Sequence, residues 1–349
     1  MTSYILKRIA ITIPMLLAMS LITFLFVQAA PGDALAKYKA NPQYQKETIE
    51  QMEREFHFDK PVMVQYYYWI KNLTRLERTQ SFPYIAYRPN MGYSFLMNEE
   101  VSTVIKSRLF YTLLLAFFSI LITWLIAIPL GIYAAVHQYK WSDRFFSFIS
   151  YVGISFPNFF LALVIMFLAG LLFQWVLTHF GIEVALLKAL STGGLGSSNF
   201  DTLSTAGKVI DRALHLLLPA LVLGTAAMAS LQRIMRGNML EELRQRYVTT
   251  ARAKGLPEHK VIYKHALRNA INPLITIFGY ELSALLSGAA LTEIVTGWPG
   301  LGSIMLEAVR GQDLFLVMGN MLMGGVMLIV GNLIADILLA LSDPRIKLS

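Results

Sequence analysis

The stretch that decides the fold is polar and lies in the second half of the chain. It reads Tyr247-Val-Thr-Thr-Ala-Arg-Ala-Lys-Gly255 and, after nine further residues, His265-Ala-Leu-Arg-Asn-Ala-Ile-Asn-Pro273. No proline or glycine interrupts residues 239–254, so one helix is expected there, and Gly255 is suited to end it. Pro273 then leads into an apolar run.

A second helix is expected after this glycine. Pro257 is typical of the first turn of a helix, which we place at residues 258–269. Val261, His265 and Arg268 follow one another at spacings of four and three, which puts them on one helical face. Two helices hinged at a glycine favour a surface that a soluble partner binds. The alternative is an ordinary basic loop.

Composition indicates a polytopic membrane protein. Apolar residues make up 55% of the chain, charged residues 15%, and the mean hydropathy is +0.52. Cysteine is absent, which excludes disulfides and cysteine metal sites. The net charge of +8 is explained by basic flanks of membrane spans, because no arginine-rich arm points to nucleic acid.

Six apolar runs are long enough to cross a bilayer, which takes roughly 20 helical residues. They cover residues 9–30, 109–136, 145–178, 213–232, 271–292 and 314–335. Pro157-Asn158 is expected to kink the third run. The first run resembles a signal peptide, but it is long for that role and Pro31 follows it, so we expect an uncleaved signal anchor.

The distribution of Lys and Arg predicts the orientation. With the N-terminus inside, the inner segments hold 15 basic residues and the short outer segments, 179–212 and 293–313, hold 4. Another 11 lie in residues 31–108, a segment too long for the positive-inside rule to weigh heavily. Both termini are therefore expected in the cytoplasm.

Two outer segments carry recognisable patterns. Residues 31–108 are expected to pack as helices outside the membrane, and their aromatic cluster Tyr66-Tyr-Tyr-Trp69 suits a membrane interface better than a ligand site. Ser191-Thr-Gly-Gly-Leu-Gly-Ser-Ser198 is expected to be a flexible loop.

Nearly the whole chain resembles a known family, the membrane permease subunits of binding-protein-dependent ABC importers, in particular the oligopeptide, dipeptide and nickel group. The polar hairpin is similar to that group's version of the EAA motif, with Thr-Ala-Arg in place of Glu-Ala-Ala. The matching stretches are Thr250–Gly255, His265–Asn269 and Pro273, flanked by Ala30-Pro-Gly-Asp33, Pro299-Gly-Leu-Gly302 and Asp343-Pro-Arg345. Arg246 and Asp313-Leu314 depart from the group's pattern.

The resemblance implies an all-α polytopic membrane protein with six transmembrane helices and the type I ABC importer architecture, including cytoplasmic coupling helices. Residues 1–30 would be the signal-anchor helix and 31–108 the extracytoplasmic segment. The permease domain would span 109–341, with the coupling hairpin at 237–272, and 342–349 would form a cytoplasmic tail. The residues implied in ATPase coupling are Tyr247, Thr250, Ala251, Arg252, Ala253, Lys254, Gly255, His265, Arg268, Asn269 and Pro273.

The resemblance also implies partners in a bacterial inner membrane: a second, homologous permease subunit, one or two ATP-binding subunits and an extracytoplasmic substrate-binding protein. ATP and Mg would be used by the partner ATPases, because this chain has no Gly-x-x-x-x-Gly-Lys-Ser/Thr loop of its own. Short peptides are the expected substrates. Nickel or another chelated metal, and glutathione-like compounds, are the alternatives within the class, and a secondary transporter or channel is the alternative outside it.

One acidic residue is a candidate for the translocation pathway. Glu281 lies about eight residues into the fifth run, where a carboxylate is costly unless it faces water or a partner. It either lines the pathway or is hydrogen-bonded across a helix interface. The six histidines show no metal-ligand spacing, and we expect neither a metal site nor a catalytic site.

Overall fold

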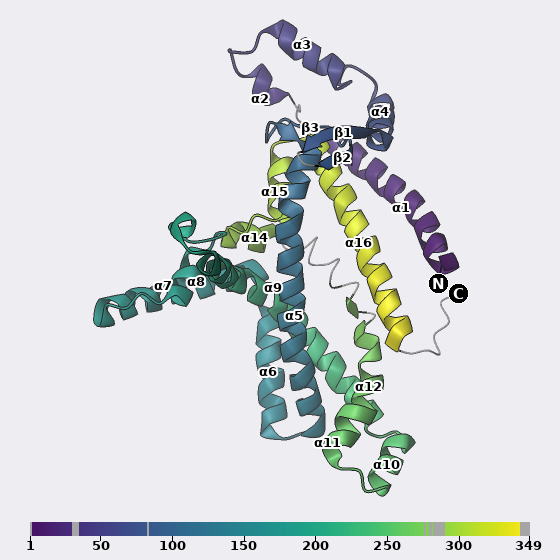
Figure 1. Cartoon of the computed structure of the whole chain (residues 1–349), viewed down its shortest axis with the longest axis vertical. Coiled ribbons are helices and arrows are strands. Elements are labelled where there is room, and N and C mark those ends of the chain that lie inside the picture. The colour runs from purple at the N-terminus through teal and green to yellow at the C-terminus, as the bar shows by residue number, and fades with distance from the viewer. Residues whose placement is uncertain are drawn as a thin grey trace. The chain divides into compact units, whose positions relative to one another are not determined.

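The computed structural model describes residues 2–29, 35–81, 84–275, 277–278, 281 and 290–342, and most of them are helical (Figure 1). The long helices are α1 (Thr2–Ala29), α5 (Val101–Val136), α7 (Asn158–Phe180), α9 (Thr205–Glu242) and α16 (Leu314–Ser342). The shorter ones are α2 (Ala36–Lys39), α3 (Lys46–Glu55), α4 (Val62–Thr74), α6 (Trp141–Ser155), α8 (Ala185–Thr192), α10 (Arg246–Ala253), α11 (Glu258–Lys260), α12 (Leu267–Ala270), α14 (Ala290–Thr296) and α15 (Leu301–Arg310). A 3-10 turn, η1 (Phe200–Thr202), and a π-helical turn, η2 (Val261–Ala266), complete the helical elements described.

The chain divides into two compact units. The first contains residues 1–110 and 300–327, and the second contains residues 111–299 and 328–349. Two of the boundaries fall within α5 and α16, and the third lies between α14 and α15. The predicted division of the chain at residues 30 and 108 stays a prediction. Each unit therefore combines segments from distant parts of the sequence.

Four helices are long and apolar enough to cross a membrane: Ala10–Ala29, Val101–Val136, Asn158–Phe180 and Leu314–Ile334. Thr205–Thr225 and Ala227–Leu243 pass the same test as a pair bent by 50°, so the described residues supply four or five spans. Much of the predicted fifth span, 271–292, lies outside the described residues. The count of six therefore stays a prediction.

The predicted kink in the third apolar run is confirmed as a full break. α6 ends at Ser155, α7 begins at Asn158, and Pro157 stands before α7 with φ −58° and ψ 138°. Proline fixes φ and disfavours the helical conformation of the residue before it, which here is Phe156 in an extended conformation. Consequently α7 alone, and not all of 145–178, has the length and composition of a span.

The first unit corrects the expectation of an entirely helical chain. Residues 31–108 contain α2 to α4 but also two antiparallel two-stranded sheets. β1 (Leu76–Ser81) pairs with β2 (Tyr84–Pro89), and β3 (Tyr93–Ser94) pairs with β4 (Glu99–Glu100). β2 is rich in aromatic and β-branched residues, which favour strands, and Asn98 takes φ 55° in the turn before β4, a conformation that asparagine tolerates.

The buried carboxylate of Asp313 links the β3–β4 loop to the start of α16 in this unit. Asp313 is 1% exposed, and one of its oxygens accepts hydrogen bonds from Ser94 Oγ at 2.7 Å and from the backbone N–H of Leu96 at 3.0 Å. The other oxygen accepts from the Leu316 N–H at 3.0 Å, as the N-cap of α16. The departure from the family pattern at this position therefore caps a helix and anchors the β3–β4 loop.

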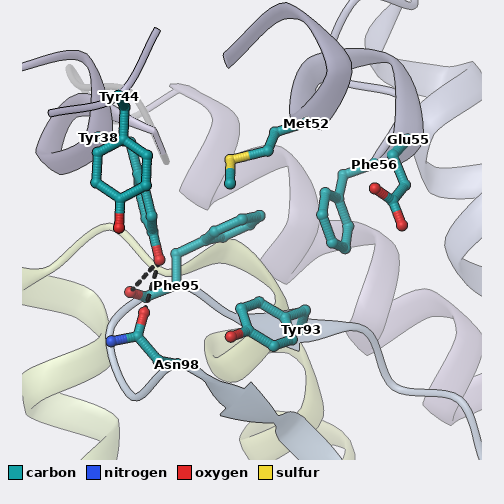
Figure 2. Close-up of a pocket in the computed structure, with 8 residues that line it drawn as sticks. All are labelled: Tyr38, Tyr44, Met52, Glu55, Phe56, Tyr93, Phe95 and Asn98. Atoms are coloured by element: carbon teal, nitrogen blue, oxygen red, sulfur yellow. Dashed lines mark hydrogen bonds between the residues drawn. The ribbon is translucent and has the colours of Figure 1, made fainter. Parts of the chain in front are cut away.

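An open pocket of about 500 Å³ lies beside the β3–β4 loop in the same unit (Figure 2). Tyr38 donates a hydrogen bond to Asn98 Oδ1 at 2.6 Å along its wall. The residues that line it are mostly aromatic, with one carboxylate: Tyr38, Tyr44, Met52, Glu55, Phe56, Tyr93, Phe95 and Asn98.

The aromatic cluster of α4 is only partly available to a membrane interface. Trp69 is 3% exposed and donates through Nε1 to the Met91 carbonyl at 3.3 Å, and the Tyr66 hydroxyl donates to the Leu17 carbonyl at 3.1 Å. Tyr67 remains 60% exposed. Half of the cluster therefore packs within the protein, as its helical spacing requires.

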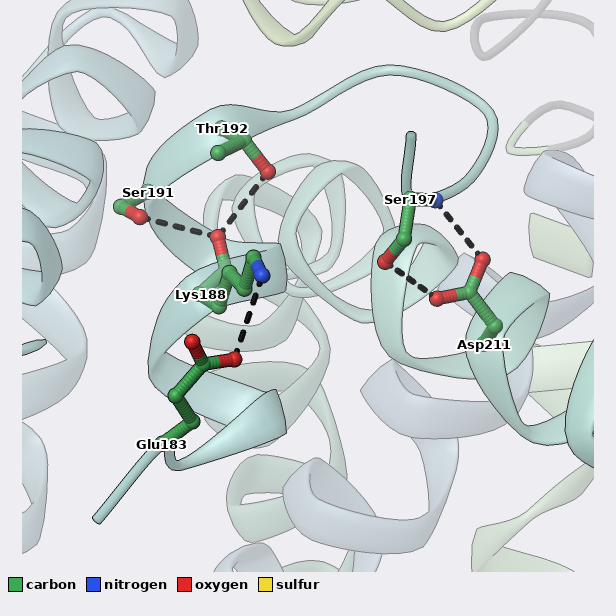
Figure 3. Close-up of polar contacts among 6 residues, drawn as sticks. All are labelled: Glu183, Lys188, Ser191, Thr192, Ser197 and Asp211. Carbon is green, nitrogen blue, oxygen red and sulfur yellow. Dashed lines mark hydrogen bonds and ion pairs between the residues drawn. The ribbon is translucent and has the colours of Figure 1, made fainter. Parts of the chain in front are cut away.

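In the second unit, the Gly- and Ser-rich loop is held in place (Figure 3). Asp211 of α9 accepts hydrogen bonds from the Ser197 N–H at 2.9 Å and from Ser197 Oγ at 2.5 Å. The Gly194 N–H donates to the Thr296 carbonyl at 2.7 Å, and a Cβ on Gly193 would lie 2.5 Å from the same oxygen. The glycines of this segment therefore permit close backbone contact, and its hydrogen bonds attach it to α9 and to the end of α14.

Replacement of the Asp313 carboxylate should destabilise the first unit. Asp313→Ala removes an N-cap and leaves a buried hydroxyl and two N–H groups short of an acceptor, which costs about 2–4 kcal/mol. The thermal midpoint of the purified protein in detergent should fall. Asp201→Ala, at an exposed aspartate, is the matched control and should leave it unchanged. Equal midpoints for the two variants would contradict the anchoring role.

Candidate functional site

The polar hairpin of the sequence forms a compact cluster at the end of α9 in the second unit (Figure 1). α10 is its first arm, and α11, η2 and α12 form the second. Gly255 separates the arms with φ 73°. The Leu256 N–H bonds to the Ala251 carbonyl at 3.4 Å and the Gly255 N–H to the Arg252 carbonyl at 2.9 Å, which is the hydrogen-bond pattern of a Schellman motif. The predicted helix stop at Gly255 is confirmed, but the single helix expected over residues 239–254 is wrong, because α9 ends at Glu242 and α10 begins at Arg246.

An apolar core fixes the two arms to α9. Val248 and Ala251 of α10 are buried against Met235 and Met239, both 0% exposed. The second arm contributes residues that are all buried in the same cluster: Val261, Ile262, Ala266 and Ala270. Burial of this many apolar side chains distinguishes the hairpin from an ordinary solvated loop.

The second arm departs from the predicted α-helical register. Residues 261–266 form a π-helical turn, which contains more residues per turn than an α-helix. Val261 is fully buried, His265 is half-buried and Arg268 is exposed, so these three residues do not share one environment. Pro257 stands at the N-cap of α11, one position before the expected first turn.

A tyrosine links three helices of the cluster. The Tyr247 hydroxyl, at the start of α10, donates to Glu242 Oε2 at the end of α9 and accepts from Asn269 Nδ2 of α12 at 3.1 Å. Burial, followed by the hydrogen bond to Glu242, raises the pKa of Tyr247 to about 12. The hydroxyl therefore stays protonated and keeps both bonds at physiological pH. Asn238 adds a bond to the Ala270 carbonyl at 3.1 Å.

An ion pair bridges the two arms across the glycine. Arg252 donates through Nε and Nη2 to Glu258, with the Nη2–Oε1 distance at 2.6 Å. The hydrogen bonds from Arg252 lower the pKa of the Glu258 carboxyl. Both side chains are about half exposed, so the pair orients the arms and adds little stability.

The predicted coupling residues divide into two groups. Ala251 is buried, His265 is half-buried, and Tyr247, although 38% exposed, is fixed by its hydroxyl. The others lie on the outside of the cluster, each of them exposed: Thr250, Arg252, Ala253, Lys254, Gly255, Arg268, Asn269 and Pro273. His259, Lys260 and Lys264 are also exposed, which gives the cluster a basic outer surface.

Glu281 is separate from the hairpin. Its Oε2 accepts a hydrogen bond from Trp124 Nε1 of α5 at 3.0 Å, and the carboxylate is partly buried. A donor across a helix interface is what the packing interpretation expects. Residues 282–289 lie outside the described part of the chain, so the pathway role stays a prediction.

One ion pair near the hairpin was not predicted from the sequence. Arg236 of α9 donates through Nε at 2.9 Å and Nη2 at 2.8 Å to Asp143 of α6. Burial of Asp143 favours a higher pKa, but the bonds from Arg236 and from the Tyr139 N–H outweigh it and lower the pKa of this carboxyl. The partners are 93 residues apart, so no sequence spacing could have signalled the pair.

The chain matches two family descriptions over almost its whole length. Residues 127–348 match "Binding-protein-dependent transport system inner membrane component". Residues 1–116 match the N-terminal family described as "Binding-prot-dependent transport system membrane comp, N-term".

Several curated proteins are similar from end to end. The oligopeptide transport system permease protein AppB of Bacillus subtilis is 35% identical over 348 residues, which is 99% of this chain and 100% of that protein. The dipeptide transport system permease protein DppB of Alkalihalophilus pseudofirmus is 33% identical, over 99% of this chain and 100% of that protein. The di/tripeptide transport system permease protein DppB of Pseudomonas aeruginosa is 31% identical, over 99% of each.

These matches cover the membrane helices and the hairpin alike. The resemblance to ABC importer permeases is thereby confirmed, and the chain belongs to the family of inner membrane components of binding-protein-dependent transport systems.

Proposed function

We propose that this permease subunit passes short peptides, received from an extracytoplasmic binding protein, through the inner membrane. The observation that carries the proposal is the end-to-end similarity to permeases whose names specify oligopeptides, dipeptides or di- and tripeptides. None of these names specifies nickel or a glutathione-like compound, so peptides are favoured over both. Membership of the family also argues against a secondary transporter or channel.

The hairpin is the proposed joint to a separate ATPase. Its arms pack on α9, and Tyr247 and the Arg252–Glu258 pair link them to each other. A displacement of the outer surface is therefore transmitted directly to α9. The exposed arginines and lysines suit an acidic cleft on the partner. A second permease subunit and one or two ATPases complete the proposed transporter. The chain itself would take no catalytic part.

The substrate class is tested by uptake. A strain that lacks this gene should lose accumulation of labelled di- to pentapeptides, and the wild-type gene on a plasmid should restore it. Nickel accumulation, measured in the same cells, should be unchanged. Loss of nickel uptake with normal peptide uptake would overturn the peptide assignment and leave the family membership intact.

The proposed orientation places both termini and the hairpin in the cytoplasm, on the evidence of the basic residues. Reporter fusions after Ser198 and after Gly255 should therefore lie on opposite sides of the membrane. Alkaline phosphatase should be active after Ser198 and inactive after Gly255, and a green fluorescent reporter should give the reverse. The same side for both fusions would contradict the topology.

The conformation of Gly255 is expected to be essential for coupling. Gly255→Val places a β-branched residue at φ 73°, which costs about 1–2 kcal/mol and changes the angle between the arms, although no neighbouring atom lies in the way. ATPase association and the substrate-stimulated part of ATP hydrolysis should both fall in the purified complex.

Gly255→Asn is the matched control for this substitution. Asparagine adds a side chain of similar size but tolerates positive φ, so it should keep most of the wild-type coupling. Full activity of the correctly inserted valine variant would show that the hairpin is an ordinary loop. Equal loss in both variants would indicate that the side chain, and not the backbone, disturbs the surface.

A further inference from the structure

A small cavity lies between α6 and α9, close to the Asp143–Arg236 pair. Its volume is about 60 Å³, and its lining is Ser147, Tyr151, Ala229, Gln232, Arg233 and Arg236. This volume is that of about two water molecules, far below the several hundred Å³ of a site for a whole small molecule. The cavity therefore fits one small polar group.

A buried amide in this cavity lacks a partner. Gln232 is 2% exposed, and its Nε2 makes no hydrogen bond to any residue that the structure describes. A buried donor left in this way costs about 1–3 kcal/mol. An acceptor from outside the chain would remove that cost.

The charges around the amide favour an anion. Arg236 uses Nε and Nη2 for Asp143, which leaves further N–H donors on its guanidinium. Arg233 is exposed, with its guanidinium carbon 6.0 Å from the centre of the Tyr151 ring, and it forms no ion pair within the described residues. Among the described residues, Asp143 is the one carboxylate bonded to the lining, and Arg236 already neutralises it. A cation would be repelled, whereas an oxyanion would find N–H donors on three residues, Gln232, Arg233 and Arg236.

The surroundings of the cavity resemble a bilayer interface. The α6 face beside it carries large aromatic side chains that are 40–76% exposed: Trp141, Phe145, Phe148 and Tyr151. Tryptophan and tyrosine, which Trp141 and Tyr151 supply here, concentrate at the level of lipid headgroups, and arginines at that level bind the headgroups. Under the proposed orientation, this is the cytoplasmic leaflet.

We propose that the cavity binds the phosphate group of an anionic phospholipid, with Gln232 and Arg233 as its main donors and the Arg236–Asp143 pair as its fixed wall. Arg233 contributes the charge and Gln232 the buried hydrogen bond. Such a lipid would tie α6 to the part of α9 that carries the hairpin. The proposal does not depend on which substrate is transported.

The test is lipid binding to the purified full chain in detergent, measured by native mass spectrometry with phosphatidylglycerol as the probe. Arg233→Gln should weaken binding at least about fivefold, the effect of one arginine near a membrane surface. Arg244→Gln removes the same charge from an exposed arginine outside the cavity and should bind as the wild type does. Equal weakening in both variants would overturn the proposal, since it would reflect net charge alone.

Gln232→Met separates binding from folding. This substitution keeps the volume and removes the unpartnered donor, so the lipid-free protein should melt at the wild-type temperature or higher, while phosphatidylglycerol binds more weakly. Wild-type lipid binding by this variant would overturn the role of Gln232. Inorganic phosphate is the competing probe: if millimolar phosphate displaces the lipid completely through the same residues, the site is one for free phosphate and the lipid assignment falls.

Discussion

Every backbone N–H and C=O inside a bilayer must find its partner within the protein, because lipid offers none. This constraint explains why the apolar stretches that the structure describes are helices and why the described strands lie in the polar segment between α4 and α5. Two carboxylates in or beside the apolar helices likewise have partners within the protein. Arg236 meets Asp143, and Trp124 meets Glu281, each pair joining two segments of the second unit.

The hairpin shows how a short polar segment becomes rigid without a domain of its own. α10 has only eight residues and α11 only three, lengths at which isolated helices are unstable in water. Their order comes from the buried Val248 and Ala251, from the glycine that turns the chain, and from the Tyr247 hydroxyl. A surface built in this way can move as one body with α9.

Helix ends that depend on a single glycine or proline could be predicted from the sequence. Hydrogen bonds and ion pairs between residues far apart in the chain could not. Gly255 and Pro157 act through their own backbone preferences, so their positions predicted the helix stop and the helix break. The β1–β2 hairpin was missed because residues 76–89 include charged positions and show no clear alternation of apolar and polar side chains. Asp313 and Asp143 bind partners 219 and 93 residues away, and nothing in a single sequence identifies such a partner. The coupling residues were predicted from the family resemblance, whereas only the structure shows which of them are held in the cluster and which lie on its outer surface.

The π-helical turn at Val261–Ala266 has an effect beyond its own six residues. Each added residue rotates the subsequent part of the helix by about 100° around its axis. Residues 267–275 are therefore out of phase with an α-helix counted from Pro257, and a helical wheel drawn from that proline assigns their faces wrongly. Such a turn is equivalent to a one-residue insertion in a helix. Alignments of this region among related permeases should accordingly place a single-residue gap here wherever a relative has lost the turn.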